Sequence, residues 1–145
     1  MKRNATAIWQ GTLKDGTGKL DTQSGALSQT PYSFKARFED ESGRSGTNPE
    51  ELIAAAHAGC FTMQLSHLLA ENGTPADRLE TEAVVTVAPK DGGGFSITRS
   101  DLSLTGTVPG IQRDVFEAIA GKAKAGCPVS VALAGVEITL EARLA

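Results

Sequence analysis

The sequence predicts an α+β fold whose strands pair in antiparallel sheets. Short strand-like segments with glycine-rich turns fill the first third of the chain, one long apolar helix follows, and a hairpin, two further helices and a final strand complete it. Strands and helices do not alternate regularly, which argues against a doubly wound parallel sheet. At 145 residues the chain is predicted to form a single domain, 1–145, large enough to bury a core without a disulfide or metal.

The first third of the chain is predicted to form strands at 5–9, 19–22 and 32–38, separated by turns. In the last of these, the aromatic and small residues alternate with polar ones, as in a half-buried strand. This alternation places Arg37 on the polar face of the expected strand.

A long helix is predicted to begin at Pro49, with Asn48 as its N-cap and Glu51 three residues after the cap. It should run to about Glu71 and end at the Asn72-Gly73 pair. Apolar residues surround most of its circumference, which indicates a central helix. A small domain cannot readily cover such a helix on all sides, so a second subunit could cover part of it.

The second half of the chain is predicted to contain a hairpin, two helices and a strand. The hairpin joins 79–87 to 95–104 across the glycine-rich turn 90–94. Helices are expected at 113–124 and 128–133, the second capped by Cys127 and opened by proline, and a strictly alternating strand at 137–144.

Composition and charge exclude several classes of function. The net charge of −3 and the scattered basic residues argue against nucleic-acid binding. The N-terminus lacks the apolar stretch of a signal peptide, and no uninterrupted apolar run of about 18 residues indicates a membrane span. We therefore expect a cytoplasmic protein, in which a cysteine pair is typically catalytic, redox-sensing or metal-binding.

The only two cysteines are the strongest candidates for chemistry. Cys60 lies in the middle of the long helix, where a free cysteine often only fills space. Cys127 lies at a predicted helix N-terminus, where unpaired N–H groups favour the thiolate. They are too far apart in sequence to form a CxxC motif, so spacing alone does not decide whether they meet.

An apolar setting raises the pKa of a thiol, so a reactive Cys60 needs a cation nearby. The candidates are Arg37 on its strand, Arg44 in a Gly/Ser-rich turn, and His57, one helical turn before Cys60. His57 is either a base paired with Cys60 or, as we favour, a buried histidine with satisfied hydrogen bonds. Glu50 lies about 15 Å before Cys60 along the helix, so it could reach the sulfur only through an arginine.

A metal site formed by the two cysteines, His57 and His67 is the less favoured alternative. These residues have suitable ligand chemistry, but they lack the short spacings of zinc sites. We therefore predict no metal and no cofactor.

Two long segments resemble the signatures of the OsmC (osmotically inducible protein C) and organic hydroperoxide resistance family. They are 47–61, TNPEELIAAAHAGCF, and 123–130, AKAGCPVS. Shorter matches occur at 24–25, 31–39, 108–111 and 137–140, so the resemblance spans nearly the whole chain in order. Arg37 fits the OsmC pattern, whereas Arg3 does not fit that of the sister resistance proteins. The loop 40–46 is longer than in the family and adds Arg44 as a second candidate arginine.

The resemblance implies an OsmC-like fold with two long central helices and an intertwined homodimer with active sites at the subunit interface. It also implies a thiol peroxidase for organic hydroperoxides, and more weakly for hydrogen peroxide. In this family pattern Cys60 is the peroxidatic cysteine and Cys127 the resolving one. Arg37 and Glu50 then lower the pKa of Cys60 and orient the peroxide.

The reaction expected from this resemblance forms a sulfenic acid on Cys60, then a Cys60–Cys127 disulfide that an external dithiol, of lipoyl type by family analogy, reduces. An apolar pocket formed by residues such as Ile53, Phe61 and Phe116 would favour organic substrates. The alternative from another class is a redox-sensing or binding module that uses the same cysteines.

Overall fold

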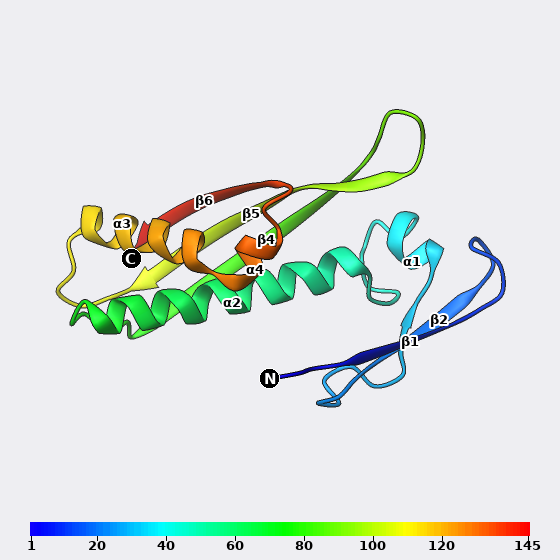
Figure 1. Cartoon of the computed structure of the whole chain (residues 1–145), viewed down its shortest axis with the longest axis horizontal. Helices are drawn as coiled ribbons and strands as arrows, with labels where there is room; N and C mark the ends of the chain where they lie inside the picture. The colour runs from blue at the N-terminus through cyan, green and yellow to red at the C-terminus, as the bar shows by residue number, and fades with distance from the viewer. The chain divides into compact units, whose positions relative to one another are not determined.

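The computed structural model describes the whole chain, 1–145, which divides into two compact units, Met1–Leu52 and Ile53–Ala145 (Figure 1). The unit boundary falls near the start of the longest helix. Each unit has its own three-stranded sheet. The predicted α+β class is confirmed.

The first unit is built on the sheet β1-β2-β3, whose strands are Ala5–Gln10, Thr17–Thr22 and Thr30–Tyr32. Both pairings in this sheet are antiparallel, as predicted. The rings of Trp9 and Tyr32 pack against each other with centroids 5.3 Å apart. Gly18 lies directly beneath Tyr32, where an added Cβ would come within 2.2 Å of the ring, so the packing requires glycine.

The predicted strand at 32–38 is wrong beyond its first residue, because Phe34–Phe38 forms the short helix α1. Ser33 caps this helix by accepting a hydrogen bond from the backbone N–H of Ala36 at 3.0 Å. The rings of Phe34 and Phe38 then meet across one helical turn, with centroids 5.0 Å apart. The alternation of aromatic residues indicated a strand here, but the Ser33 cap produces a helix, and the sequence analysis did not predict this cap.

Helix α2 spans Pro49–Glu71, the bounds that the sequence predicted. The side chain of Asn48 accepts a hydrogen bond from the N–H of Glu51 at 2.8 Å, as expected of its N-cap. Gly73, with a φ of 78°, ends the helix in the left-handed conformation that glycine adopts readily. By length and composition alone α2 could cross a membrane, but the same features suit a core helix, and three of its large side chains, Phe61, Leu65 and Leu69, are fully buried.

The second unit contains the sheet β4-β5-β6, formed by Arg78–Pro89, Phe95–Thr107 and Glu137–Leu144. Strands β4 and β5 form the predicted hairpin, whereas β5 and β6 pair in parallel. This departs from the expected antiparallel arrangement. The parallel pairing requires a crossover, which helices α3 (Arg113–Gly126) and α4 (Pro128–Ala132) provide.

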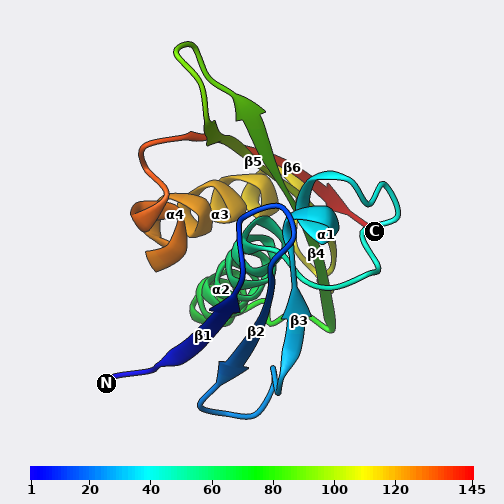
Figure 2. The same ribbon diagram turned by 90° about the vertical axis from the view of Figure 1, so that its right-hand side faces the viewer.

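The core of the second unit lies between the sheet and its helices. Helices α2 and α3 lie along one face of the β4-β5-β6 sheet (Figure 2). Their buried side chains pack with the inward residues of β5 in one apolar cluster that includes Phe61, Leu65, Leu102, Leu104 and Phe116. Cys127 belongs to this cluster and Cys60 packs against it, so the core itself positions both thiols.

Candidate active site

Cys60 lies in the middle of α2, on the side of the helix that faces the core of the second unit. Its side chain is half-buried. Phe61 beside it is fully buried, which fixes the rotation of the helix and directs this part of α2 towards the core. Cys60 therefore combines a rigid position with a surface that a small molecule can reach.

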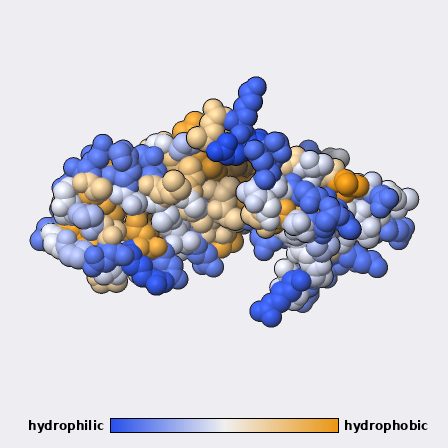
Figure 3. Space-filling model, turned by 90° about the horizontal axis from the view of Figure 1, so that it is seen from below, coloured by the Kyte–Doolittle hydropathy of each residue, from blue (hydrophilic) through white to orange (hydrophobic).

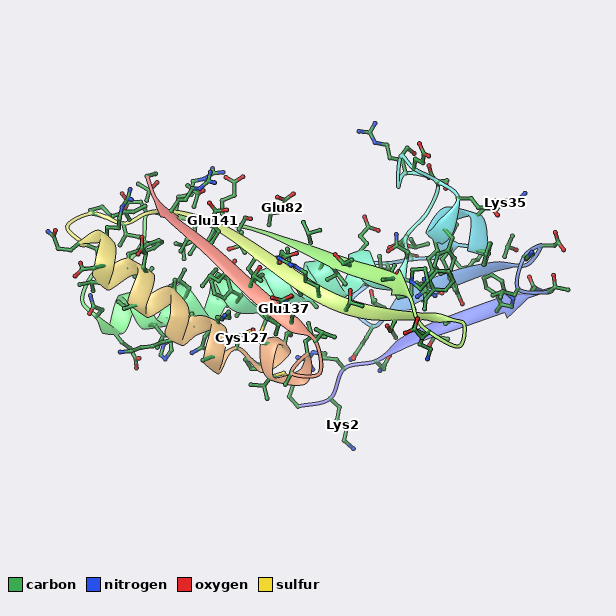
Figure 4. The ribbon with its side chains drawn as sticks, turned by 90° about the horizontal axis from the view of Figure 1, so that it is seen from above. Lys2, Lys35, Glu82, Cys127, Glu137 and Glu141 are labelled. Atoms are coloured by element: carbon green, nitrogen blue, oxygen red, sulfur yellow. The ribbon has the colours of Figure 1, made fainter.

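Cys127 lies at the turn between α3 and α4, where one helix ends and the next begins (Figure 4). It is the N-cap residue of α4 and Pro128 follows at the first helical position, as predicted. Its backbone carbonyl accepts the hydrogen bond of the Val131 N–H that opens α4. Unlike Cys60, Cys127 is fully buried.

The two thiols are free, lie at the same core cluster, and each shifts the pKa of the other. Burial raises the pKa of Cys60; the backbone N–H of Val129 opposes this increase and the neighbouring Cys127 adds to it. Burial acts in the same direction on Cys127, but the N–H of Ser130 and the thiol of Cys60 outweigh it and hold the pKa of Cys127 below its ordinary value. Within the second unit, the start of α4 thus favours a thiolate on Cys127.

Arg37 and Glu50 meet within the first unit. Arg37 lies on α1 and donates two hydrogen bonds to the Glu50 carboxylate, from Nε to Oε2 at 3.1 Å and from one terminal nitrogen to Oε1 at 2.6 Å. This bidentate contact is the strong geometry for an arginine and a carboxylate. The guanidinium also lies over the Phe38 ring, 4.8 Å from its centroid. Glu50, in the first turn of α2, therefore fixes the orientation of Arg37.

The rival arginine, Arg44, lies in an exposed loop organised by Asp40. The Asp40 carboxylate accepts hydrogen bonds from the Ser42 side chain and from the backbone N–H groups of Ser42, Arg44 and Ser45. These contacts, led by the Ser42 hydroxyl, hold the pKa of Asp40 well below its usual range. The loop therefore binds the backbone of Arg44, and no carboxylate holds its guanidinium as Glu50 holds that of Arg37.

A pocket of about 340 Å³ opens in the first unit beside Arg37. Its walls are mainly apolar and include the aromatic residues Trp9, Tyr32, Phe34 and Phe38. An apolar pocket with a single oriented cation suits a ligand that has an apolar body and one polar end.

His57 is a fully buried histidine with both ring nitrogens in hydrogen bonds, as we favoured from the sequence. Nδ1 lies 2.7 Å from the Ser100 hydroxyl and Nε2 lies 2.9 Å from the Ser130 hydroxyl. Burial lowers the pKa of His57 below its ordinary value, so the ring is neutral near pH 7. His67 instead contacts Glu71 on the exposed side of α2. No group of three or more potential metal ligands comes together anywhere in the structure.

Comparison with known proteins decides the family. The family model described as OsmC-like protein matches residues 40–141. The chain is 48% identical to peroxiredoxin OsmC of Escherichia coli (strain K12) over 142 residues, which cover 98% of this chain and 96% of the relative. The chain belongs to the OsmC-like protein family.

More distant relatives of this OsmC-like protein agree. The organic hydroperoxide resistance protein OhrB of Bacillus subtilis (strain 168) is 32% identical over 100 residues, which cover 68% of this chain and 71% of the relative. The crystal structure of B. subtilis OhrB superposes with a TM-score of 0.74 at 27% identity and covers 97% of this chain and 98% of that one. An OsmC-like protein from Vibrio cholerae, at 15% identity, shares the fold with a TM-score of 0.76 over 98% of this chain and 99% of its own.

In this OsmC-like protein, two of the three residues that the sequence suggests for an apolar pocket lie in the core instead. Phe61 and Phe116 are fully buried in the core, so they cannot line a pocket that a substrate enters. Ser100 and Ser130, the two hydrogen-bond partners of His57, are not among the residues that the sequence predicts. The position of Ser130, three residues after the N-cap Cys127, could have indicated it, because this is the residue whose N–H faces a cap side chain. Nothing in the local sequence identifies Ser100.

Proposed function

We propose that this OsmC-like protein is a cysteine-based peroxidase that reduces organic hydroperoxides, and hydrogen peroxide more weakly. The observation that carries the proposal is that the only two cysteines are free thiols at one core cluster, Cys127 within it and Cys60 packed against it. The names of the relatives, a peroxiredoxin and organic hydroperoxide resistance proteins, support the same reaction. A nearby thiol pair is what a sulfenic acid needs in order to form a disulfide.

The two cysteines have different roles in this proposal, and their exposure supports the division. A peroxide must reach the nucleophile, and only Cys60 has exposed surface, whereas Cys127 has none. The Cys60 thiolate attacks one peroxide oxygen, the O–O bond breaks, and the alkoxide leaves as an alcohol after taking up a proton. The Cys60 sulfenic acid then reacts with Cys127 to give a disulfide and water.

The attack requires a thiolate on Cys60, although burial raises the pKa of this thiol. A guanidinium close to the sulfur would reverse that effect. We assign this task to Arg37, which is the arginine held by a carboxylate, Glu50, in a bidentate contact. The aromatic pocket beside Arg37 would then receive the organic part of the substrate.

We further propose that the protein acts as an intertwined homodimer. In the single chain, α2 leaves a stripe of small and apolar residues exposed, formed by Ala55, Ala56, Gly59 and Met63, the last 77% exposed. Figure 3, which views the chain from below, shows apolar residues gathered on the surface. An added Cβ at Gly59 would meet nothing within 4 Å. Glycine within a helix is about 1 kcal/mol less favourable than alanine, and a partner subunit that approaches closely at Gly59 would explain its presence there.

The remaining parts of the proposal concern the whole chain and its reductant. We propose that 1–145 acts as one peroxidase domain, since Arg37 lies before residue 40, where the family match begins. Turnover then requires an external dithiol, of lipoyl type by family analogy, that reduces the disulfide by exchange. We place the protein in the cytoplasm and expect no metal or cofactor in the reaction.

The decisive experiment assigns the two cysteines separately. Reduced Cys127→Ser protein treated with one equivalent of tert-butyl hydroperoxide should form a sulfenic acid on Cys60 that dimedone traps, but no intramolecular disulfide. Cys60→Ser protein should leave the peroxide unconsumed. Full peroxide reduction by Cys60→Ser protein would refute the assignment.

A further inference from the structure

The turn between α3 and α4 contacts helix α2 at two points, one on each side of Cys60. At the first, Nε2 of His57 lies 2.9 Å from the hydroxyl of Ser130, on α4. At the second, a Cβ added to Gly126 would lie 3.8 Å from the side-chain nitrogen of Gln64. His57 precedes Cys60 by three residues and Gln64 follows it by four, so all three lie on one face of α2.

These two contacts place Cys127 beside the stretch of α2 that carries Cys60. Cys127 follows Gly126 directly in the turn, and Cys60 lies between the two contact residues of α2. Cys127 also belongs to the apolar cluster of this unit, and Cys60 packs against that cluster. The contacts between the turn and α2 therefore determine how closely the two sulfurs can approach.

His57 joins three elements of the second unit, because it lies on α2 and contacts β5 and α4. Its Nδ1 lies 2.7 Å from the hydroxyl of Ser100 on β5, and its Nε2 contacts Ser130 on α4. His57 and Ser100 have no exposed surface and Ser130 is 7% exposed. No buried side-chain polar atom in the chain lacks a hydrogen-bond partner, so loss of either serine hydroxyl would leave a buried ring nitrogen unpaired. The bond to Ser100 fixes the ring, and the fixed ring holds α4.

Helix α4 depends on such contacts for its position. It has five residues, and a helix this short has little stability of its own. Its N-cap, Cys127, makes no side-chain hydrogen bond that would cap the helix. Ser130 carries the one polar side chain of α4 and gives it to His57. The hydrogen bond between His57 and Ser130 is therefore the polar link that fixes the start of α4 against α2.

We propose that His57 is a positioning residue for disulfide formation, which holds the start of α4 so that Cys127 lies within reach of Cys60. This inference rests on the proposed peroxidase function. In the step that it assists, the Cys127 sulfur attacks the sulfur of the Cys60 sulfenic acid, an S–S bond forms and the S–O bond breaks. The departing hydroxide and the proton of the Cys127 thiol form water, so no further reactant is needed.

Two amide substitutions separate the two contacts of the ring. The amide of asparagine can occupy the place of Nδ1, and that of glutamine can occupy the place of Nε2. His57→Asn therefore keeps the bond to Ser100 and loses the link to α4, whereas His57→Gln keeps the bond to Ser130. Ser130→Ala and Ser100→Ala remove the same two bonds from the other side, which keeps the test valid if a histidine variant folds poorly.

The first measurement needs no peroxide. Reduced protein is equilibrated with reduced and oxidised glutathione, and the fraction of intramolecular disulfide gives the effective concentration of the thiol pair. In His57→Asn and Ser130→Ala we expect this concentration to fall by about fivefold to tenfold, the effect of losing one buried hydrogen bond. His57→Gln and Ser100→Ala should lower it by a smaller factor. Ser103→Ala, which changes an exposed serine on the same strand as Ser100, should match the wild type.

The second measurement separates the two chemical steps. Reduced protein is mixed rapidly with one equivalent of tert-butyl hydroperoxide, and an alkylating quench with mass spectrometry follows Cys60 oxidation and disulfide formation. In His57→Asn and Ser130→Ala disulfide formation should slow by a factor similar to the fall in effective concentration. Cys60 oxidation should change much less, because Cys127 takes no part in the attack on the peroxide.

Several results would overturn the role of His57. One is an effective concentration that is unchanged or higher in folded His57→Asn and Ser130→Ala proteins. Another is an equal loss in His57→Asn and His57→Gln, or equal slowing of both chemical steps, as expected if the histidine only supports the fold. A wild-type protein that forms the disulfide in glutathione but leaves Cys60 unoxidised by the peroxide would instead refute the proposed peroxidase function.

Discussion

Replacing Glu50 by glutamine tests how Arg37 is held in place. The substitution preserves the shape of the side chain but removes the charge and one of the two acceptor oxygens that now receive hydrogen bonds at 2.6 and 3.1 Å. A hydrogen bond to a charged group contributes about 1.5–3 kcal/mol in a buried setting. Arg37 is 35% exposed and Glu50 10% exposed, so solvent screening reduces the loss to about 1–2 kcal/mol.

A loss of this size corresponds to roughly a tenfold change, because about 1.4 kcal/mol is a factor of ten. If Arg37 must be oriented by Glu50 to stabilise the Cys60 thiolate, the second-order rate constant for Cys60 oxidation falls by about that factor. The assay is stopped-flow oxidation of reduced protein by tert-butyl hydroperoxide at pH 7, with urea unfolding to measure stability.

The adjacent glutamate provides the control. Glu51 is exposed and its carboxylate accepts a hydrogen bond from the Thr47 hydroxyl at 2.7 Å, an interaction that a glutamine oxygen can replace. Glu51→Gln should therefore oxidise at the wild-type rate. Wild-type oxidation by Glu50→Gln protein of unchanged stability would refute the role assigned to the Arg37–Glu50 pair.

Three further predictions concern stability and assembly. An alanine Cβ at Gly106 would lie 2.6 Å from the fully buried Phe116 ring, so Gly106→Ala should lower the free energy of unfolding by about 1–3 kcal/mol. Gly121 on α3 has open space around it, so Gly121→Ala should raise the free energy of unfolding by up to about 1 kcal/mol. Urea unfolding measures both changes. Burial lowers the pKa of His57, so below pH 6.5, the ordinary pKa of this group, the unfolded chain binds a proton that the folded chain does not. The free energy of unfolding should therefore fall between pH 7 and 5, by at most about 1.4 kcal/mol per pH unit. His57→Gln should reduce this dependence on pH. Gly59→Leu meets no obstacle within its own chain, so it should leave the chain folded but prevent dimer formation, as measured by light scattering; a dimeric variant would contradict the assigned interface.

Local signals predicted most of the elements. Asn48 and Pro49 predicted the start of α2, and the strict alternation of apolar and polar residues predicted the bounds of β6. Both signals are local, because capping and side-chain periodicity depend only on neighbours in sequence. The same logic failed at 32–38, where alternating aromatic residues indicated a strand and a serine cap produced a helix instead. Two local patterns competed there, and the sequence does not show which is more stable.

The site was predictable only in part, because its geometry is tertiary. The resemblance suggests Cys60, Cys127, Arg37 and Glu50 as site residues, but spacing in the sequence does not show that the two cysteines lie at one core cluster. Their shared position at the core depends on the crossover of α3 and α4, which also makes β6 parallel to β5. The serines around His57 come from β5 and α4, so no local pattern in the sequence could have connected them.

The central claim is tested most directly by counting the hydroperoxide molecules that each subunit reduces when dihydrolipoamide is supplied in excess. A peroxidase with a Cys60–Cys127 disulfide cycle should consume many equivalents of tert-butyl hydroperoxide per subunit, and Cys60→Ser should abolish this consumption. A redox sensor would consume one equivalent and stop. One equivalent without recycling by any small dithiol or by thioredoxin would contradict the account.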